Sequence, residues 1–264
     1  MEKTSVRGTE KESAESKLFI PSAVTASSSE SEKHRNRSVI TTQIQAYSSH
    51  YRELMSYYRC AMMEVETKFK VLNEELSLEY DRNPIEAIKT RLKSFGSIAD
   101  KLEAYGIPFS VDNIEAHLND VAGVRVICGF PADIYSLSEA FLRQDDITLI
   151  KMKDYLKNPK DNGYRSLHLI VEIPIFLHDE KRLMKVEVQF RTIMMDWWAS
   201  LEHKIRYKKD LEIPESISKE LFECAKAAAF LDNRMEQIQK AIEAANENAK
   251  LKENENEKLE EKNP

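Results

Sequence analysis

Lys185-Val-Glu-Val-Gln-Phe-Arg191 alternates apolar and polar side chains, which is the period of a half-buried β-strand. The apolar side chains share one face, which we expect to pack on a core. The other face carries Glu187, Gln189 and Arg191. Taken alone, this polar face is as typical of solvated surface as it is of a binding site.

A second predicted strand has a polar face of the same kind. Tyr164, Ser166 and His168 share one side of it, and Leu167 and Leu169 share the other. Two such faces in one sheet favour a functional site built on rigid strands.

Short runs rich in β-branched residues predict the strands of one sheet. These runs are Val121–Cys128, Thr148–Met152, Ser166–Ile173 and Met184–Phe190. Helical spacing predicts crossing helices at Ala132–Arg143 and Ile193–Tyr207. The order of elements indicates an α+β fold, in which a mixed sheet is flanked by helices.

Long helices are predicted on both sides of the sheet region. An apolar stripe at steps of three and four runs from Ile44 to Leu76, so a helix should end near Tyr80. Asn83-Pro84 resembles an N-cap and first-turn proline, which predicts a second helix. That helix would run through Ile85, Ile88 and Leu92, with Gly96 interrupting it and Gly106 and Pro108 closing the unit.

The C-terminal part shows a heptad stripe after Pro214. Its positions are Ile217, Leu221, Cys224, Ala228, Leu231, Met235, Ile238 and Ile242. After Ala245 the apolar positions thin out, and we expect the helix end to fray. The expected organisation is a disordered arm at 1–40, a catalytic domain at 44–212, the heptad helix at 213–245 and a charged tail at 246–264.

Composition excludes several classes of protein. The 264 residues are 42% hydrophobic, but no apolar run approaches the roughly 20 residues of a membrane span. Three widely spaced cysteines argue against a disulfide framework or zinc knuckle, and the N-terminus lacks the apolar stretch of a secretory signal. We therefore expect a cytoplasmic location. The net charge of -6 disfavours a generic nucleic-acid coat protein.

Acidic and basic residues suggest a site for a nucleotide polyphosphate. Asp120 at the mouth of a strand and Glu187 on a neighbouring one could hold a magnesium ion, although an Asp before a strand is more often a turn former. Basic side chains that could neutralise phosphates lie in two groups, after the second predicted helix and around the loop before Tyr164. They are Arg91, Lys93 and Lys101 in the first group, and Lys151, Lys153, Lys157, Lys160 and Arg165 in the second.

Other catalytic patterns are missing from the sequence. Glu202-His203 is not a zinc-protease signature, because the residue four positions after His203 is Tyr207. The chain has no Walker loop and no nucleophile elbow, and Cys128 is best interpreted as a small core residue.

Five segments in order resemble the synthetase domain of the RelA/SpoT family, and above all its single-domain members, the small alarmone synthetases. The resemblance covers roughly Tyr51 to Ile242. The segments are Arg91–Lys101, Asp120-x-x-Gly-x-Arg125, Asp154–His168, Val186–Thr192 and Met195–His203.

The resemblance implies a nucleotidyltransferase-like fold and a pyrophosphokinase reaction. The β,γ-pyrophosphate of ATP would move to the 3′-hydroxyl of GDP or GTP, giving ppGpp or pppGpp with AMP as leaving group. It implies that Arg91, Lys93 and Lys101 hold the ATP phosphates and that Arg125 stacks on adenine.

The remaining roles implied by the resemblance concern the metal and the acceptor. Asp120 would ligate Mg²⁺, with Glu187 as second ligand or as base for the 3′-hydroxyl. Tyr164 would stack on guanine, Lys160 and His168 would contact the acceptor phosphates, and Gln189 and Asp196 would border the guanosine.

Two positions depart from some relatives. Lys153 replaces an arginine that forms the other half of an adenine sandwich, and lysine has no planar guanidinium, so we expect weaker adenine stacking. Asp196 replaces an asparagine, and its carboxylate can still accept the guanine N1 and N2 hydrogens.

Partners and alternative functions follow from the same resemblance. A homo-oligomer, commonly a tetramer, is expected through the two apolar stripes, the alternative being packing within one chain. The preference for GDP or GTP and allosteric binding of pppGpp or single-stranded RNA stay open. Two other functions also stay open: a catalytically silent nucleotide- or RNA-binding homologue, and a pyrophosphokinase for tRNA or an adenosine nucleotide.

Overall fold

The computed structural model describes the backbone of residues 30–80, 82–206 and 214–260. The chain divides into two compact units, residues 1–47 and 48–264, and the second contains the whole sheet. Residues 1–29 of the arm predicted to be disordered lie outside the described residues. Helix α1 (Glu30–Tyr80) begins earlier than predicted, so residues 30–40 are helical. Glu, Lys and Arg favour this backbone without any apolar stripe.

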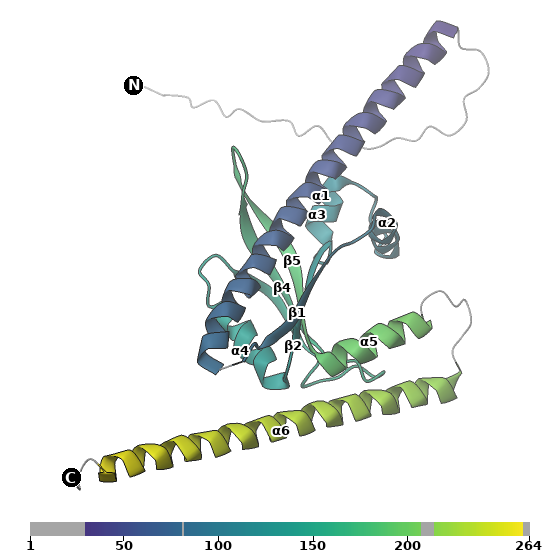
Figure 1. Cartoon of the computed structure of the whole chain (residues 1–264). Helices are drawn as coiled ribbons and strands as arrows, with labels where there is room; N and C mark the ends of the chain where they lie inside the picture. Colours follow the sequence, from purple (N-terminus) through teal and green to yellow (C-terminus); the bar gives the residue numbers. More distant parts are fainter. Residues whose placement is uncertain (1–29, 81, 207–213, 261–264) are drawn as a thin grey trace, which may run out of the picture. The chain divides into compact units, whose positions relative to one another are not determined.

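A five-stranded mixed sheet forms the centre of the second unit, in the order β1-β2-β5-β4-β3 (Figure 1). Strand β2 pairs with β5 in parallel, and every other neighbouring pair is antiparallel. The strands are β1 (Ile85–Leu92), β2 (Ala122–Cys128), β3 (Thr148–Asp154), β4 (Leu167–Phe176) and β5 (Lys181–Thr192). The predicted α+β class and the four predicted strands are confirmed.

The predicted second helix is wrong, because Ile85–Leu92 is the edge strand β1. Ile85, Ile88 and Leu92 fall at helical spacing, but seven register pairs with β2 supply the backbone partners that a helix would otherwise provide. Helix α2 (Phe95–Ala104) starts only afterwards, capped by the Ser94 hydroxyl, and Gly96 lies in its first turn.

The core lies on the side of the sheet that α1 and α4 (Pro131–Leu142) cover. Phe69 of α1 stacks on Phe141 of α4 at 4.6 Å between ring centroids and meets Phe190 of β5 edge-on at 5.4 Å. Short helices α2 and α3 (Val111–His117) add Ile98, Leu102 and Ile114 to the same core. The apolar stripe predicted for α1 is buried from Leu54 to Leu72.

Helices α5 (Ile193–Arg206) and α6 (Glu215–Glu260) lie side by side (Figure 1). Trp198 packs on Ala225 and Ala228, and its indole nitrogen donates to the Leu221 carbonyl at 2.9 Å. α6 stays helical beyond Ala245, where fraying was expected, because the many Glu, Lys and Ala residues favour a helix even without an apolar face. No described helix is apolar enough over its length to cross a membrane.

One hydroxyl group joins α6 to the end of β5. Thr192 Oγ1 donates to Asp232 Oδ2 at 2.6 Å and accepts from the Met195 backbone amide at 3.1 Å. Asp232 is buried, and the loss of solvation raises its pKa to about 6, although Thr192 and the charge of Arg165 act in the opposite direction. The first turn of α5 is therefore held by a carboxyl group from another helix.

The wild-type protein should lose stability as the pH rises through 6, and we expect Asp232→Asn to remove this loss. A carboxyl whose pKa rises from 3.8 to about 6 on folding stabilises the fold most below pH 4, and that contribution is lost as the pH rises through 6. The asparagine oxygen can still accept from Thr192. In urea unfolding, the free energy of unfolding of the variant relative to that of wild type should increase by about 2 kcal/mol between pH 4 and pH 8.

The exposed Asp179→Asn is the control, and its stability should stay parallel to that of wild type over this pH range. A constant difference between Asp232→Asn and wild type would contradict the prediction.

Candidate active site

The face of the sheet opposite α1 carries two rows of side chains that cross all five strands. Residues paired in register point to the same face, so each row is continuous. The first row is Lys89, Arg125, Gln189, His168 and Lys153. The second row is Arg91, Gly123, Glu187, Ile170 and Lys151.

A cleft of about 260 Å³ opens over β1, β2 and β5. Asp120 and Glu187 line it together with basic side chains of β1 and β2. Gly123 stands between Arg91 and Glu187 in the second row, where any side chain would project into the cleft. The glycine therefore keeps open the space between the cations of β1 and the carboxylate of β5.

Asp120 is held by two lysines. Its Oδ2 atom lies 2.7 Å from Nζ of Lys93 and 2.7 Å from Nζ of Lys101. Burial raises the pKa of Asp120, but the two ammonium groups outweigh it and the pKa is lowered overall. Its Oδ1 atom is buried and has no hydrogen-bond partner among the described residues. A cation or a hydrogen-bond donor placed in the cleft could therefore bind this oxygen.

Glu187 receives polar contacts on both carboxylate oxygens. Gln189 Nε2 donates to Oε2 at 2.8 Å, and His168 Nδ1 lies 3.3 Å from Oε1. Burial raises the pKa of Glu187, His168 and Gln189 lower it, and the net shift is downward. The nearby charge of Asp120 raises this pKa, as expected for two carboxylates that share one cleft.

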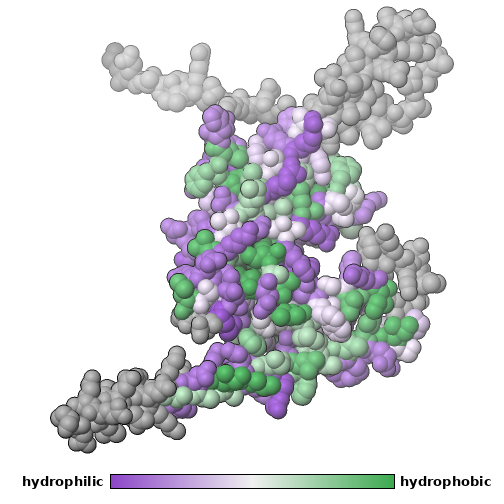
Figure 2. Space-filling model, in the orientation of Figure 1, coloured by the Kyte–Doolittle hydropathy of each residue, from purple (hydrophilic) through white to green (hydrophobic). Residues whose placement is uncertain are grey.

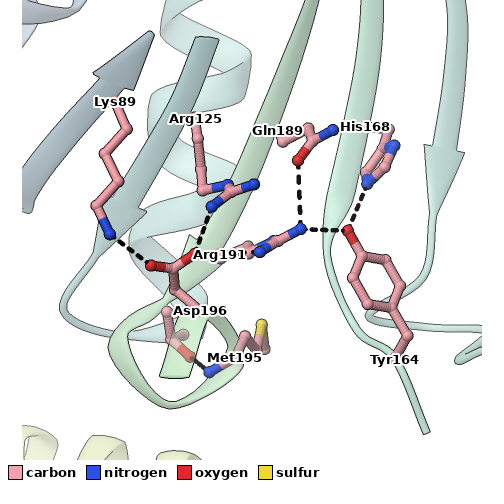
Figure 3. A network of polar contacts seen from close by, with 9 residues as sticks. Lys89, Arg125, Tyr164, His168, Gln189, Arg191, Met195 and Asp196 are labelled. Atoms are coloured by element: carbon pink, nitrogen blue, oxygen red, sulfur yellow. Dashed lines mark hydrogen bonds and ion pairs between the residues drawn. The ribbon is translucent and has the colours of Figure 1, made fainter. Parts of the chain in front are cut away.

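Asp196, in the first turn of α5, anchors three cations from three strands (Figure 3). Its Oδ2 pairs with Lys89 at 2.8 Å, and its Oδ1 accepts from Arg125 at 3.0 Å and from Arg191 at 3.1 Å. Burial raises the pKa of Asp196, but the three cations lower it overall. One buried carboxylate thus holds Lys89 and Arg125 of the first row together with Arg191.

An aromatic cluster lies beside Glu187. The rings of Tyr155, Tyr164 and His168 meet edge-on, with centroids 5.5 to 6.0 Å apart. Lys160 Nζ lies 5.0 Å above the Tyr155 ring and 5.1 Å above the Tyr164 ring. This cluster offers flat rings and a cation at the edge of the cleft, which suits a base that carries phosphates.

Residues 90–212 match the family model described as the region found in RelA/SpoT proteins. The GTP pyrophosphokinase YwaC of Bacillus subtilis is 44% identical over 70% of this chain and 89% of its own length. The chain belongs to the RelA/SpoT family. All five predicted segments lie within the matched region.

Solved structures of RelA/SpoT family members share this fold. Small alarmone synthetase 2 from Bacillus subtilis has a TM-score of 0.66 and is 42% identical, covering 72% of this chain and 98% of that one. Small alarmone synthetase 1 from the same organism, bound to its product pppGpp, has a TM-score of 0.64 and is 34% identical, covering 70% of this chain and 94% of that one. The nucleotidyltransferase-like α+β fold is consistent with these structures.

The structure brings most of the predicted site residues of this family member together. Arg91, Lys93, Asp120, Arg125, Glu187 and Gln189 line the cleft. Lys101 joins them through Asp120, while Tyr164 and His168 are hydrogen-bonded to each other at 2.9 Å, and Lys160 lies over the Tyr164 ring. Lys153 stands at the far end of the first row, exposed on β3.

Three residues of the site were missed in the sequence. Lys89 was assigned to a helix, and the alternation of Lys89, Arg91 and Lys93 along a strand would have revealed it. Arg191 was placed on the polar face but given no role, although it contacts both Tyr164 and Asp196. Tyr155 lies within the Asp154–His168 segment of the resemblance but was given no role.

Asp196→Asn should destabilise the protein by about 3 kcal/mol, because it leaves the buried Arg191 and the half-buried Arg125 without their counter-charge. Lys89→Met is the matched comparison. Its side chain is 55% exposed, so its ion pair with the same carboxylate should contribute less than about 1 kcal/mol. Chemical unfolding near neutral pH measures both, and equal losses in the two variants would contradict this ranking.

Proposed function

We propose that this chain transfers the β,γ-pyrophosphate of ATP to the 3′-hydroxyl of GDP or GTP, releasing AMP and forming ppGpp or pppGpp. The GTP pyrophosphokinases and small alarmone synthetases that it resembles support the reaction. The observation that carries the proposal is the cleft itself. Two carboxylates and a row of cations share one face of a rigid sheet, beside a cluster of aromatic rings.

The donor phosphates would bind at the β1 side of the cleft. Arg91 and Lys93 lie two residues apart on one face of the chain, and Lys101 reaches the same place from α2. Both lysines now share Oδ2 of Asp120, so a polyphosphate would receive cations that are already oriented. Arg125 would stack on adenine, with Lys153 as a weaker second contact.

Asp120 and Glu187 suit a magnesium ion. Both present carboxylate oxygens to one cleft, and the buried Oδ1 of Asp120 lacks a hydrogen-bond partner among the described residues. When bound there, Mg²⁺ would neutralise charge on the transferred phosphates. Asp120 would be the first ligand and Glu187 the second ligand or the base.

The acceptor would bind at the β4 side of the cleft. Tyr164 would stack on guanine, and Lys160 would contact the acceptor phosphates. His168, which the resemblance also gives to these phosphates, has both ring nitrogens engaged, one 2.9 Å from the Tyr164 hydroxyl and the other 3.3 Å from Glu187. Gln189 and Asp196 would border the guanosine, as the resemblance implies. The contacts of Asp196 to Arg125 and Arg191 add a second way in which it would serve the site, by holding those cations in place.

Glu187→Gln should lower synthesis by a factor on the order of 10² to 10⁴, the range expected when a general base is lost. Asp120→Asn should also weaken magnesium-dependent ATP binding. The test incubates the purified full chain with ATP, GDP and Mg²⁺ and measures AMP and guanosine products by ion-exchange chromatography. Calorimetric titration with a non-hydrolysable ATP analogue separates binding from turnover.

The acceptor is tested by running ATP labelled at the γ-phosphate against GMP, GDP, GTP, an adenosine nucleotide and tRNA. Label that appears on tRNA or on the adenosine nucleotide instead of on GDP or GTP would overturn the acceptor. A Glu187→Gln variant that keeps more than a tenth of wild-type synthesis would overturn the role given to that residue.

We also propose that the enzyme is a homo-oligomer that pairs through α6. Apolar side chains lie along this helix without cover from the rest of the second unit (Figure 2). Leu231, Met235, Ile238 and Ile242 follow one another at steps of four and three and are 43 to 54% exposed. Such a stripe is typical of helix pairing between copies.

Leu231→Glu combined with Ile238→Glu should dissociate the oligomer, because both changes place charge in the apolar stripe. Sedimentation velocity of the wild type and the variant measures the assembly. The control combines Asn233→Glu with Gln237→Glu, which add the same charge at exposed positions of α6. A wild-type monomer, or dissociation of the control as well, would remove this interface.

A further inference from the structure

Arg191 is a buried cation to which neither the family resemblance nor the proposed function gives a role. Its side chain at the end of β5 is only 7% exposed. Nη1 donates to Asp196, while Nη2 donates to the Tyr164 hydroxyl at 2.8 Å and to Gln189 Oε1 at 3.3 Å (Figure 3). The last two contacts begin two hydrogen-bonded arms that lead to the same carboxylate.

The first arm runs through Tyr164 and His168. A guanidinium can only donate, so the Tyr164 oxygen accepts from Arg191 and keeps its own hydrogen for another partner. That partner is His168 Nε2, 2.9 Å away. A neutral imidazole that accepts at Nε2 carries its hydrogen on Nδ1, and this nitrogen lies 3.3 Å from Glu187 Oε1.

The second arm runs through Gln189. Because Arg191 donates to Gln189 Oε1, the amide oxygen faces the guanidinium and the amide nitrogen faces the other way. That nitrogen donates to Glu187 Oε2 at 2.8 Å. One guanidinium therefore sets the direction of a donor to each oxygen of one carboxylate.

The root of both arms is itself fixed. Asp196 Oδ1 accepts a hydrogen bond from Nη1 of Arg191, which holds the edge of the guanidinium that faces away from the two arms. The same oxygen also accepts from Arg125. Lysine could replace the charge of Arg191, but a single ammonium cannot reproduce this planar fork. The geometry thus depends on the shape of the group as well as on its charge.

We propose that Arg191 is a positioning residue for Glu187, acting through the Tyr164–His168 arm and the Gln189 arm to hold both carboxylate oxygens in one orientation. The inference rests on the proposed function, in which Glu187 acts on the 3′-hydroxyl or on the metal. Reaction at a hydroxyl requires a fixed direction of approach, so loss of this orientation lowers turnover more than it lowers substrate binding.

The first test compares Arg191→Lys with Arg182→Lys. Arg182 lies on the same strand, its Nη2 donates to both carboxylate oxygens of Glu115, and neither residue lines the cleft. Arg191→Lys should lower kcat about 10- to 100-fold, the loss typical of removing an outer partner of a functional group. The KM values for ATP and GDP should change less than about threefold, and Arg182→Lys should keep kcat within about twofold.

An unchanged kcat in Arg191→Lys would overturn the proposal. A raised KM for GDP with kcat intact would also overturn it, because Arg191 would then only shape the acceptor pocket.

The second test separates the two nitrogens of His168. Asparagine places an amide nitrogen near Nδ1, and glutamine places one near Nε2. His168→Asn should therefore keep the donor to Glu187 and retain at least tenfold more turnover than His168→Gln. The reverse order, with a raised KM for GDP in His168→Asn, would show that the outer nitrogen contacts the acceptor instead, and would overturn the first arm.

A double-mutant cycle tests whether Arg191 acts through His168. The two side chains are joined through Tyr164, so Arg191→Lys should cost less in the His168→Gln background than in wild type. If the fold-losses in kcat of the two single variants simply multiply in the double variant, Arg191 does not act through His168 and the first arm is overturned.

A nucleotide-free measurement keeps this inference distinct from the proposed function. In ¹⁵N NMR spectra of the wild-type chain near neutral pH, His168 should carry its hydrogen on Nδ1. A hydrogen on Nε2 would overturn the hydrogen-bond arrangement whatever the activity. A wild-type protein that forms no AMP while His168 carries Nδ1–H would overturn the proposed function and leave the arrangement standing.

Discussion

The parallel pairing of β2 with β5 is the constraint on which the site depends. Parallel neighbours cannot be joined by a tight turn, so the chain crosses through α4 and adds β3 and β4 before β5 returns beside β2. This pairing sets Gly123 opposite Glu187 and Arg125 opposite Gln189. Asp120, just before β2, then opens onto the same cleft as Glu187. The topology alone brings together carboxylates that are far apart in the sequence.

The three carboxylates of the site differ in what holds them, and this separates their chemistry. Cations hold Asp120 and Asp196, which compensates the cost of burying each charge. Glu187 is held instead by the amide of Gln189 and the ring of His168. Among the described residues no lysine or arginine forms an ion pair with Glu187, so its oxygens are available to a metal ion or to a substrate hydroxyl.

The central strands β2, β4 and β5 could be predicted from the sequence, because each buries one face and is rich in β-branched residues. A short β-branched run also indicated the edge strand β3. The other edge strand, β1, could not be predicted. Ile85, Ile88 and Leu92 recur at a helical spacing, and only pairing with β2 makes this segment a strand. The same reasoning explains the site. Faces within one strand, such as that of Glu187 and Gln189, follow from alternation, whereas the convergence of three strands on Asp196 leaves no local pattern.

Register also limits what a resemblance to other family members can transfer. Arg125 and Lys153 lie in one row but on strands three spacings apart, about 14 Å at the usual distance between strands. A ring stacked between two groups needs them only about 7 Å apart, twice a van der Waals contact. The two side chains can contact the two faces of one adenine only if both extend over Gln189 and His168, which lie between them in the row. Donor and acceptor would thus compete for the same strip of sheet, and the side chains in its middle would decide which base lies where.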